Sequence, residues 1–211
     1  MDWIFLRYDA DEFIMGSKEE QYDTWKAGAR VLGIAESFSK QDSTSTVVGI
    51  VMRGDLRIDG FGLCHPTVGG LDSTDEIISM YEELKRPDIR ALLLGGTVIS
   101  WFNIVDLQEL YDAVGIPVIS VTYEETEGIE KYIREYFPQD HEIRMEMVKK
   151  GGERKEVSLD NNQSVFVNLV GMNIRKCKDV LNTFVIEGRV PEPIRVSRLI
   201  AGVLRKRFYP T

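Results

Sequence analysis

The sequence predicts a single α/β domain built on one mixed β-sheet with helices on both faces. Two observations lead to this prediction. Three β-branched, apolar segments come first, and the connection between the first two is too short to hold a helix. Helical and strand patterns then alternate to the end of the 211 residues, a length that suits one hydrophobic core.

The first three strands are expected at residues 30–37, 46–55 and 56–65. Short connections join neighbouring strands in antiparallel fashion, so we expect an antiparallel meander. A plain doubly wound sheet is the alternative, and it would need a helix between the first strands.

A helix and a buried strand follow. Residues 71–86 predict a helix, because Ser73 and Glu76 have the spacing of a capping box and apolar residues then recur on one helical face. The apolar run at residues 89–94 predicts a strand that stops abruptly at Gly95-Gly96. The carboxyl end of such a strand is where ligands bind in open α/β sheets, so the paired glycines mark a candidate site.

Residues 103–115 predict a short helix that ends at Gly115, and residues 116–122 predict a fifth strand. The fourth and fifth strands are apolar throughout, as central parallel strands are. We therefore expect both of them to lie parallel to the first strand.

The remaining residues predict helices at 127–137, 141–150, 173–188 and 190–208, with a hairpin at 155–171. The last helix is expected to bury one apolar stripe, made of Val196, Leu199, Ile200, Val203 and Leu204. Three antiparallel strands followed by helix, strand, helix, strand and helix is the order of the ribonuclease H-like fold. We assign this domain to residues 30–211 and treat residues 1–29 as an N-terminal extension of unknown role.

Composition excludes several classes of protein. With 43% apolar and 28% charged residues, no basic apolar leader and no membrane segment, the chain is typical of a soluble protein, and we expect it in the cytoplasm. Cys64 and Cys177 are far apart in sequence and are expected to be reduced. His65 and His141, the two histidines, are too few and too isolated to predict a zinc site or a Ser-His-Asp triad.

The net charge of -8 divides unevenly, because residues 1–140 carry a net charge of -14 and residues 141–211 a net charge of +6. This division predicts an acidic body with a basic C-terminal face that could meet nucleic acid. The expected contacts are Arg195, Arg198, Arg205, Lys206 and Arg207. In the alternative interpretation Arg195 pairs with Glu192, and the terminal cluster is only solvated.

Several motifs carry a family resemblance: "VLGIAESF", "GIVMRGD", "TVGGLDSTDEII", "LLLGGTV", "FNIVDLQEL", "GIPVISV" and "IEGRVPEPIRVSRLIA". In this order they resemble the archaeal family called domain of unknown function 99, which is similar to endonuclease V. The resemblance covers roughly residues 30–205 and implies a nuclease. Such nucleases hold a divalent metal with acidic side chains at the ends of the first and fourth strands.

The expected acids are replaced in this chain. The family's Gly-Ile-Asp-Asp is Gly33-Ile34-Ala35-Glu36 here, and its Leu-Asp-Gly is Leu94-Gly95-Gly96. Arg198 stands where the resemblance implies a histidine. We therefore expect a cleft that holds no metal or other cofactor and has lost nuclease activity, formed by Ala35, Gly95, Gly96, Trp101 and Asn103.

The predicted function is that of a nucleic-acid-binding or regulatory module. One alternative is a nuclease that binds Mg²⁺ or Mn²⁺ through relocated ligands, with Glu36, Asp72 and Asp106 as candidates. In that alternative Asn103 and Asp106 share one face of the predicted helix. A protein-interaction scaffold, including a homo-oligomer, is the third alternative.

Overall fold

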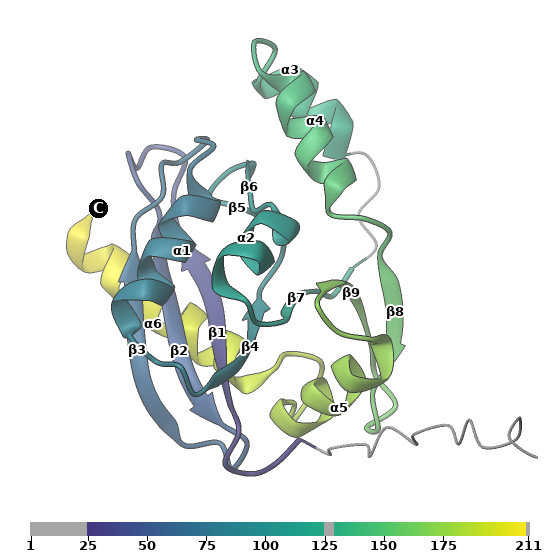
Figure 1. Cartoon of the computed structure of the whole chain (residues 1–211). Helices are drawn as coiled ribbons and strands as arrows, with labels where there is room; N and C mark the ends of the chain where they lie inside the picture. The colour runs from purple at the N-terminus through teal and green to yellow at the C-terminus, as the bar shows by residue number, and fades with distance from the viewer. Residues whose placement is uncertain (1–24, 125–128, 210–211) are drawn as a thin grey trace, which may run out of the picture.

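The computed structural model describes residues 25–124 and 129–209, and most of the predicted extension, residues 1–24, lies outside them. A seven-stranded mixed sheet in the order β3-β2-β1-β4-β7-β9-β8 forms the centre of the described chain (Figure 1). β1 (Arg30–Ser37), β2 (Thr46–Arg53) and β3 (Ile58–Cys64) form the predicted antiparallel meander.

The parallel part of the sheet also agrees with the prediction. β4 (Ile89–Leu94) pairs in parallel with β1, and β7 (Val118–Thr122) pairs in parallel with β4. β8 (Lys155–Ser158) and β9 (Ser164–Val170) form the expected hairpin and extend the sheet beyond β7. β1 therefore lies inside the sheet, and its carboxyl end is beside that of β4.

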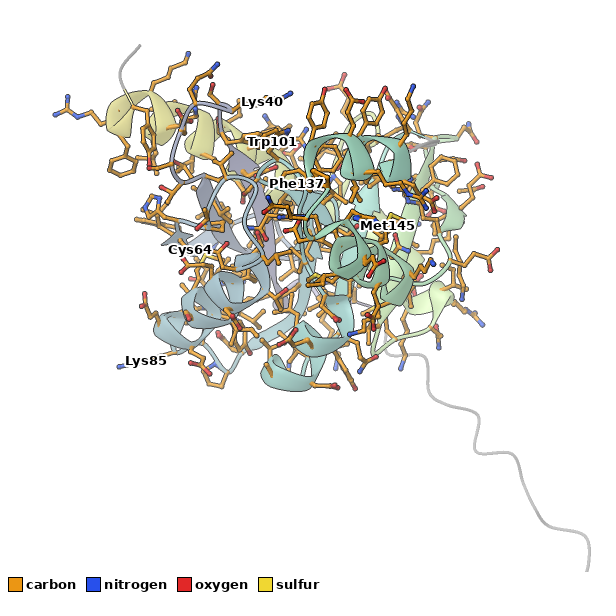
Figure 2. The ribbon with its side chains drawn as sticks, turned by 90° about the horizontal axis from the view of Figure 1, so that it is seen from above. Lys40, Cys64, Lys85, Trp101, Phe137 and Met145 are labelled. Carbon is orange, nitrogen blue, oxygen red and sulfur yellow. The ribbon has the colours of Figure 1, made fainter. Side chains whose placement is uncertain are left out.

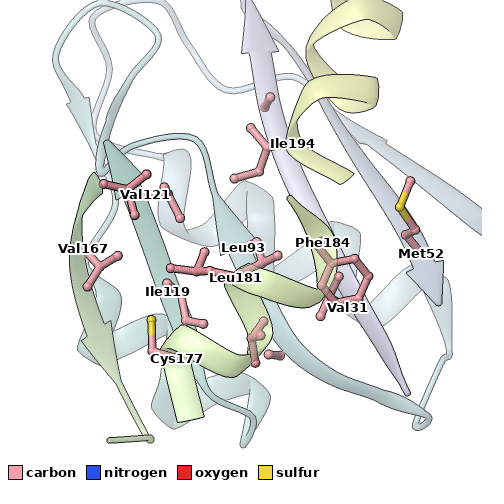
Figure 3. Close-up of a cluster of buried hydrophobic side chains, with 14 of the residues drawn as sticks. Val31, Met52, Leu93, Ile119, Val121, Val167, Cys177, Leu181, Phe184 and Ile194 are labelled. Atoms are coloured by element: carbon pink, nitrogen blue, oxygen red, sulfur yellow. The ribbon is translucent and has the colours of Figure 1, made fainter. Parts of the chain in front are cut away.

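Helices cover both faces of this sheet, as predicted. α1 (Ser73–Leu84) and α2 (Leu107–Val114) pack on one face, around buried residues such as Ile77, Leu92 and Leu110. α5 (Ile174–Phe184) and α6 (Glu192–Phe208) cover the other face. Figure 3 shows the core of that second face, in which side chains of α5 and α6 meet those of the strands.

A further pair of helices stands apart from these two layers. α3 (Ile129–Tyr136) and α4 (His141–Lys150) rise above the end of the sheet at which β1 and β4 finish (Figure 1). They pack over a two-stranded ribbon, β5 (Val98–Ile99) and β6 (Asn103–Ile104), through Ile104, Ile133 and Met145. The sequence did not predict this ribbon, because two residues are too few to show the alternation of apolar and polar residues that is typical of a strand.

The ribbon corrects the predicted helix at residues 103–115. α2 begins only at Leu107, because Asp106 caps it and accepts hydrogen bonds from the backbone N–H groups of Gln108 and Glu109. Asn103 belongs to β6. Asn103 and Asp106 therefore do not share a helical face, and that prediction was wrong.

The start of α1 also differs from the prediction. Ser73 is the first helical residue and Asp72 is the N-cap, so Ser73 and Glu76 do not form a capping box. The Glu76 carboxylate instead accepts a hydrogen bond from the backbone N–H of His65 at 3.1 Å. Glu76 thus ties the helix to the end of β3.

The buried face of α6 is only partly the predicted stripe, because Val196, Ile200 and Leu204 pack against the core but are half-buried. Leu199 and Val203 are exposed, whereas Ile194, Ser197 and Ala201 face the sheet. The reason is the close approach of α6 to β1 at Gly33, where a Cβ atom would lie 2.4 Å from Pro193 Cβ. Small side chains must face the strand where two backbones come so near.

No helix within residues 25–124 and 129–209 is long and apolar enough to cross a membrane. Cys64 and Cys177 are free and buried in the core, as expected.

Candidate functional site

A small cavity opens at the carboxyl ends of β1 and β4. The two strands stay in register to Ile34 and Leu94, and the Gly95 N–H then donates to the Ile34 carbonyl oxygen at 3.0 Å. The cavity has a volume of about 150 Å³ and is lined by Ile34, Ala35, Glu36, Val47, Ile77, Leu94, Gly95, Gly96, Ile99 and Arg198. Most of these residues are apolar, and Glu36 and Arg198 add one carboxylate and one guanidinium.

The Glu36 carboxylate is engaged in hydrogen bonds at this cavity. Its Oε2 accepts from the Ser100 N–H at 2.5 Å, from Ser100 Oγ at 2.8 Å and from Ser45 Oγ at 3.1 Å. Burial raises the pKa of Glu36, and the hydrogen bonds from Ser100 and the charge of Arg198 offset that rise only in part. Glu36 therefore anchors the Ser100 backbone.

Arg198 brings a positive charge next to Gly95, the position where the resemblance implies a carboxylate. It projects from α6 into the cavity, and a Cβ atom built on Gly95 would lie 3.5 Å from its Nη2 atom. That distance is an ordinary van der Waals contact, so the guanidinium lies directly beside Gly95.

The candidate metal ligands do not converge. Asp72 binds the Thr67 N–H and hydroxyl at 3.1 and 2.7 Å and the Asn103 Nδ2 at 2.6 Å. Burial opposes ionisation of Asp72, but these hydrogen bonds outweigh it and lower its pKa. Asp106 caps α2, and its second oxygen lies 3.8 Å from Lys150 Nζ. Each of these acids thus has a local structural contact.

The donor set at the cavity does not fit Mg²⁺ or Mn²⁺. Within the described part of the chain, no group of three or more His, Cys, Asp or Glu side chains could hold a metal ion. These cations need several oxygen ligands, and the cavity offers one carboxylate beside a guanidinium. The structure does not bring Glu36, Asp72 and Asp106 together as a relocated site.

The predicted basic residues have different surroundings. Arg195 pairs with Glu192 at 2.5 Å, as the alternative interpretation expected, and Arg205 pairs with Asp42 at 2.6 Å. Lys206 and Arg207 are exposed near the C-terminal end of α6. Arg198, the fifth of the predicted basic residues, is the one of them that lines the cavity.

The predicted cleft residues separate into two groups. Ala35, Gly95 and Gly96 line the cavity. Asn103 is buried behind it, where it accepts from the Ser73 N–H at 3.1 Å and donates to Asp72. Trp101 lies in the turn beyond Ile99, with its ring 5.1 Å from that of Phe137.

Arg144, which was not predicted as a site residue, holds this turn from the other side. Its side chain is 2% exposed and donates to the carbonyl oxygens of Gly69 at 2.7 Å, Gly70 at 2.9 Å and Phe102 at 2.6 Å. It also pairs with Asp140 at 2.7 Å. An arginine within a polar helix gives no signal of burial. The role of Arg144 could therefore not be predicted from the residues beside it in the sequence.

Comparisons with known proteins show the family to which the chain belongs. A family model described as endonuclease dU matches residues 27–205. A UPF0215 protein of Methanosarcina barkeri is 35% identical over 179 residues, which cover 83% of this chain and 90% of that protein. A UPF0215 protein of Pyrobaculum calidifontis is 30% identical over 176 residues, covering 83% of this chain and 96% of that protein. The family match and these relatives support the predicted endonuclease V-like family.

Solved structures give the same result for the fold. A protein of unknown function from Archaeoglobus fulgidus superposes with a TM-score of 0.73 at 30% identity, covering 83% of this chain and 97% of that one. Human ENDOV gives a TM-score of 0.59 at 12% identity, covering 89% of both chains. Ciona intestinalis endonuclease V, solved with a DNA that contains inosine, gives 0.55 at 14% identity, with 86% of this chain and 87% of that one covered. These likenesses confirm the predicted endonuclease V-like, ribonuclease H-like fold.

Proposed function

Because the chain belongs to the endonuclease dU family, we propose that it binds nucleic acid at the strand-end cavity without a catalytic metal and without cutting the strand. The observation that carries this proposal is the position of Arg198. Its guanidinium lies next to Gly95, where the resemblance implies a metal-binding carboxylate. A fixed organic cation there can attract a phosphate group directly.

The chemistry of the guanidinium suits a phosphodiester. Its N–H groups form a planar fork that matches two phosphate oxygens, and such charge-assisted hydrogen bonds are among the strong ones. Arg198 lines the cavity and is exposed, so a nucleic-acid strand could reach it from solvent. The Ciona relative, which has the same fold, was solved with DNA bound.

The same arrangement disfavours hydrolysis. Metal-assisted cleavage requires charged oxygen ligands that hold the cation and lower the pKa of a bound water. Ala35 and Gly95 supply a methyl group and a hydrogen atom at the two strand ends, and the Glu36 carboxylate is already bound to Ser100 and Ser45. A guanidinium can hold a phosphate, but it does not activate water as a metal does.

Replacing Arg198 with alanine is expected to weaken binding of a labelled 20-nucleotide single strand by about tenfold or more. A hydrogen bond to a charged group contributes about 1.5–3 kcal/mol, and 1.4 kcal/mol corresponds to tenfold. The slope of log K against log salt should fall by about 0.7, since one phosphate contact is lost from a single strand. Fluorescence anisotropy across a salt series measures both quantities.

Lys206→Ala is the matched control, because it removes one exposed positive charge from the same helix away from the cavity. We expect its dissociation constant to stay within about twofold of the wild-type value, as is usual for single exposed charges. Equal losses in the Arg198 and Lys206 variants would indicate diffuse attraction to the C-terminal face. An Arg198→Ala protein that binds as tightly as wild type would contradict the proposal.

A further inference from the structure

Aromatic side chains form an exposed ledge beside the cavity. We call Trp101, Phe102, Tyr132 and Tyr136 the aromatic ledge. The Trp101 and Tyr136 rings are 5.9 Å apart, and the Tyr132 and Tyr136 rings are stacked at 6.5 Å with an interplanar angle of 8°. Tyr132 and Tyr136 remain 48% and 42% exposed. The face of an aromatic ring that is open to solvent is available to a planar ligand.

A lysine covers part of this ledge. Lys40 Nζ lies 5.4 Å from the centre of the Trp101 ring and 5.0 Å from that of Tyr136. Figure 2 shows Lys40, Trp101 and Phe137 gathered at the end of the molecule seen from above. The ledge therefore combines two half-buried and two exposed aromatic rings with a cation, and these are the kinds of group that bind single-stranded nucleic acid.

The backbone that presents the ledge is strained. Ser100, Trp101 and Phe102 are consecutive non-glycine residues with φ values of 45°, 57° and 62°. Such residues avoid the left-handed region, and strain of this kind gathers at binding sites where the surrounding structure enforces it. Glycine would relieve the strain in a turn that served only to connect β5 to β6.

Contacts from both sides enforce this turn. Glu36 binds the N–H and the hydroxyl of Ser100, and Arg144 binds the carbonyl oxygen of Phe102 at 2.6 Å. The Arg144 guanidinium also stacks on the Phe137 ring at 3.9 Å. The ledge is therefore held rigidly, which limits the conformational entropy that a ligand would have to remove.

The ledge is continuous with the cavity. Ile99, the last residue of β5, lines the cavity, and the turn that contains Trp101 begins at the next residue. Glu36 lines the cavity as well, and its carboxylate holds Ser100. A nucleic-acid strand with a phosphate at Arg198 would therefore lie on the same surface as the aromatic ledge.

We propose that the aromatic ledge stacks unpaired bases of a single-stranded nucleic acid whose backbone is held at Arg198. The proposal rests on the proposed function and specifies its ligand. Aromatic rings stack any base through its face, and bases in a duplex are already stacked on one another and have no free face to offer. Lys40 would pair with a phosphate beside the stacked bases. Trp101 and Tyr136 are the two residues that carry the effect.

The test compares two labelled 20-nucleotide single strands with the same number of phosphates, one of thymidines and one fully abasic. Trp101→Ala should weaken binding of the thymidine strand by about tenfold or more, from the loss of a stacking interaction, and leave the abasic strand within about twofold. Arg198→Ala should weaken both strands. Phe61→Ala removes an exposed aromatic ring from β3, an edge strand of the sheet, and should change neither.

Tyr136→Leu is a second variant, and it too should weaken binding of the thymidine strand but not of the abasic strand. It provides the test if Trp101→Ala does not fold. In the wild-type protein, the thymidine strand should also quench tryptophan fluorescence more than the abasic strand does. If Arg198→Ala weakens both strands while the Trp101 and Tyr136 variants bind thymidine normally, the ledge proposal is wrong and the proposed function stands. If neither strand binds the wild-type protein, both proposals are wrong.

Discussion

Replacing Arg144 with methionine is expected to lower the free energy of unfolding by about 3–5 kcal/mol, the cost of breaking a buried charged network. The substitution leaves the carbonyl oxygens of Gly69, Gly70 and Phe102 without their donor in a buried site. It also leaves Asp140 without its partner. Urea denaturation followed by circular dichroism measures the change.

Arg134→Met is the matched control for this variant. Arg134 is exposed in the last turn of α3, the helix that neighbours α4, so its loss should change the free energy of unfolding by less than about 0.5 kcal/mol. A loss below about 1 kcal/mol in Arg144→Met would mean that water replaces the guanidinium at the three carbonyl groups. In that case Arg144 would not be what holds the turn in place.

Gly33→Ala is expected to destabilise the protein by about 2–3 kcal/mol, toward the upper end of the range for overpacked cores. The added methyl group would lie 2.4 Å from Pro193 Cβ and 2.5 Å from the Pro193 carbonyl carbon. Because one of these atoms is backbone, α6 must move away from β1. Arg198 is on the same helix, so binding at the cavity should weaken in parallel. Thermal and urea denaturation give the stability change.

Gly202→Ala tests the same substitution in α6 where no atom lies within 4 Å of the new Cβ. It should stabilise the protein by about 0.5–1 kcal/mol, because alanine has the higher helix propensity. A destabilising effect of equal size at both glycines would contradict the assignment of the Gly33 effect to close packing against α6.

The fold could be predicted because its signals are local. Apolar runs marked β1, β4 and β7, and the short connection between β1 and β2 required an antiparallel pair. The buried face of α6 could not be predicted in this way. It depends on the contact of Gly33 with Pro193, residues that are far apart in sequence. This contact places Ser197 and Ala201 against the sheet and leaves the predicted Leu199 and Val203 exposed.

Part of the site could also be predicted. Comparison with the family motifs identified Ala35, Gly95 and Arg198, and the structure places all three at one cavity. The contact of Arg144 with the Trp101 turn could not be found, because its partners at Gly69 and Gly70 belong to a distant part of the chain. The positive φ angles at three consecutive non-glycine residues could not be predicted from the sequence either.

A guanidinium and a bound metal ion respond differently to a chelator. A chelator removes a metal ion but leaves a guanidinium in place, and only the metal would activate water toward phosphorus. Burial raises the pKa of Glu36, which disfavours the charged form that a metal ligand must have. Metal dependence therefore separates the proposed function from a nuclease with relocated ligands.

The most direct test follows one labelled single strand by anisotropy and by denaturing gel, with EDTA in one arm and with millimolar Mn²⁺ in the other. We expect the same dissociation constant in both arms within about twofold, and intact strand throughout, because Arg198 and not a metal holds the phosphate. Mn²⁺-dependent cleavage that is lost in Glu36→Gln would contradict this account and support a metal-dependent nuclease that uses Glu36 as a ligand.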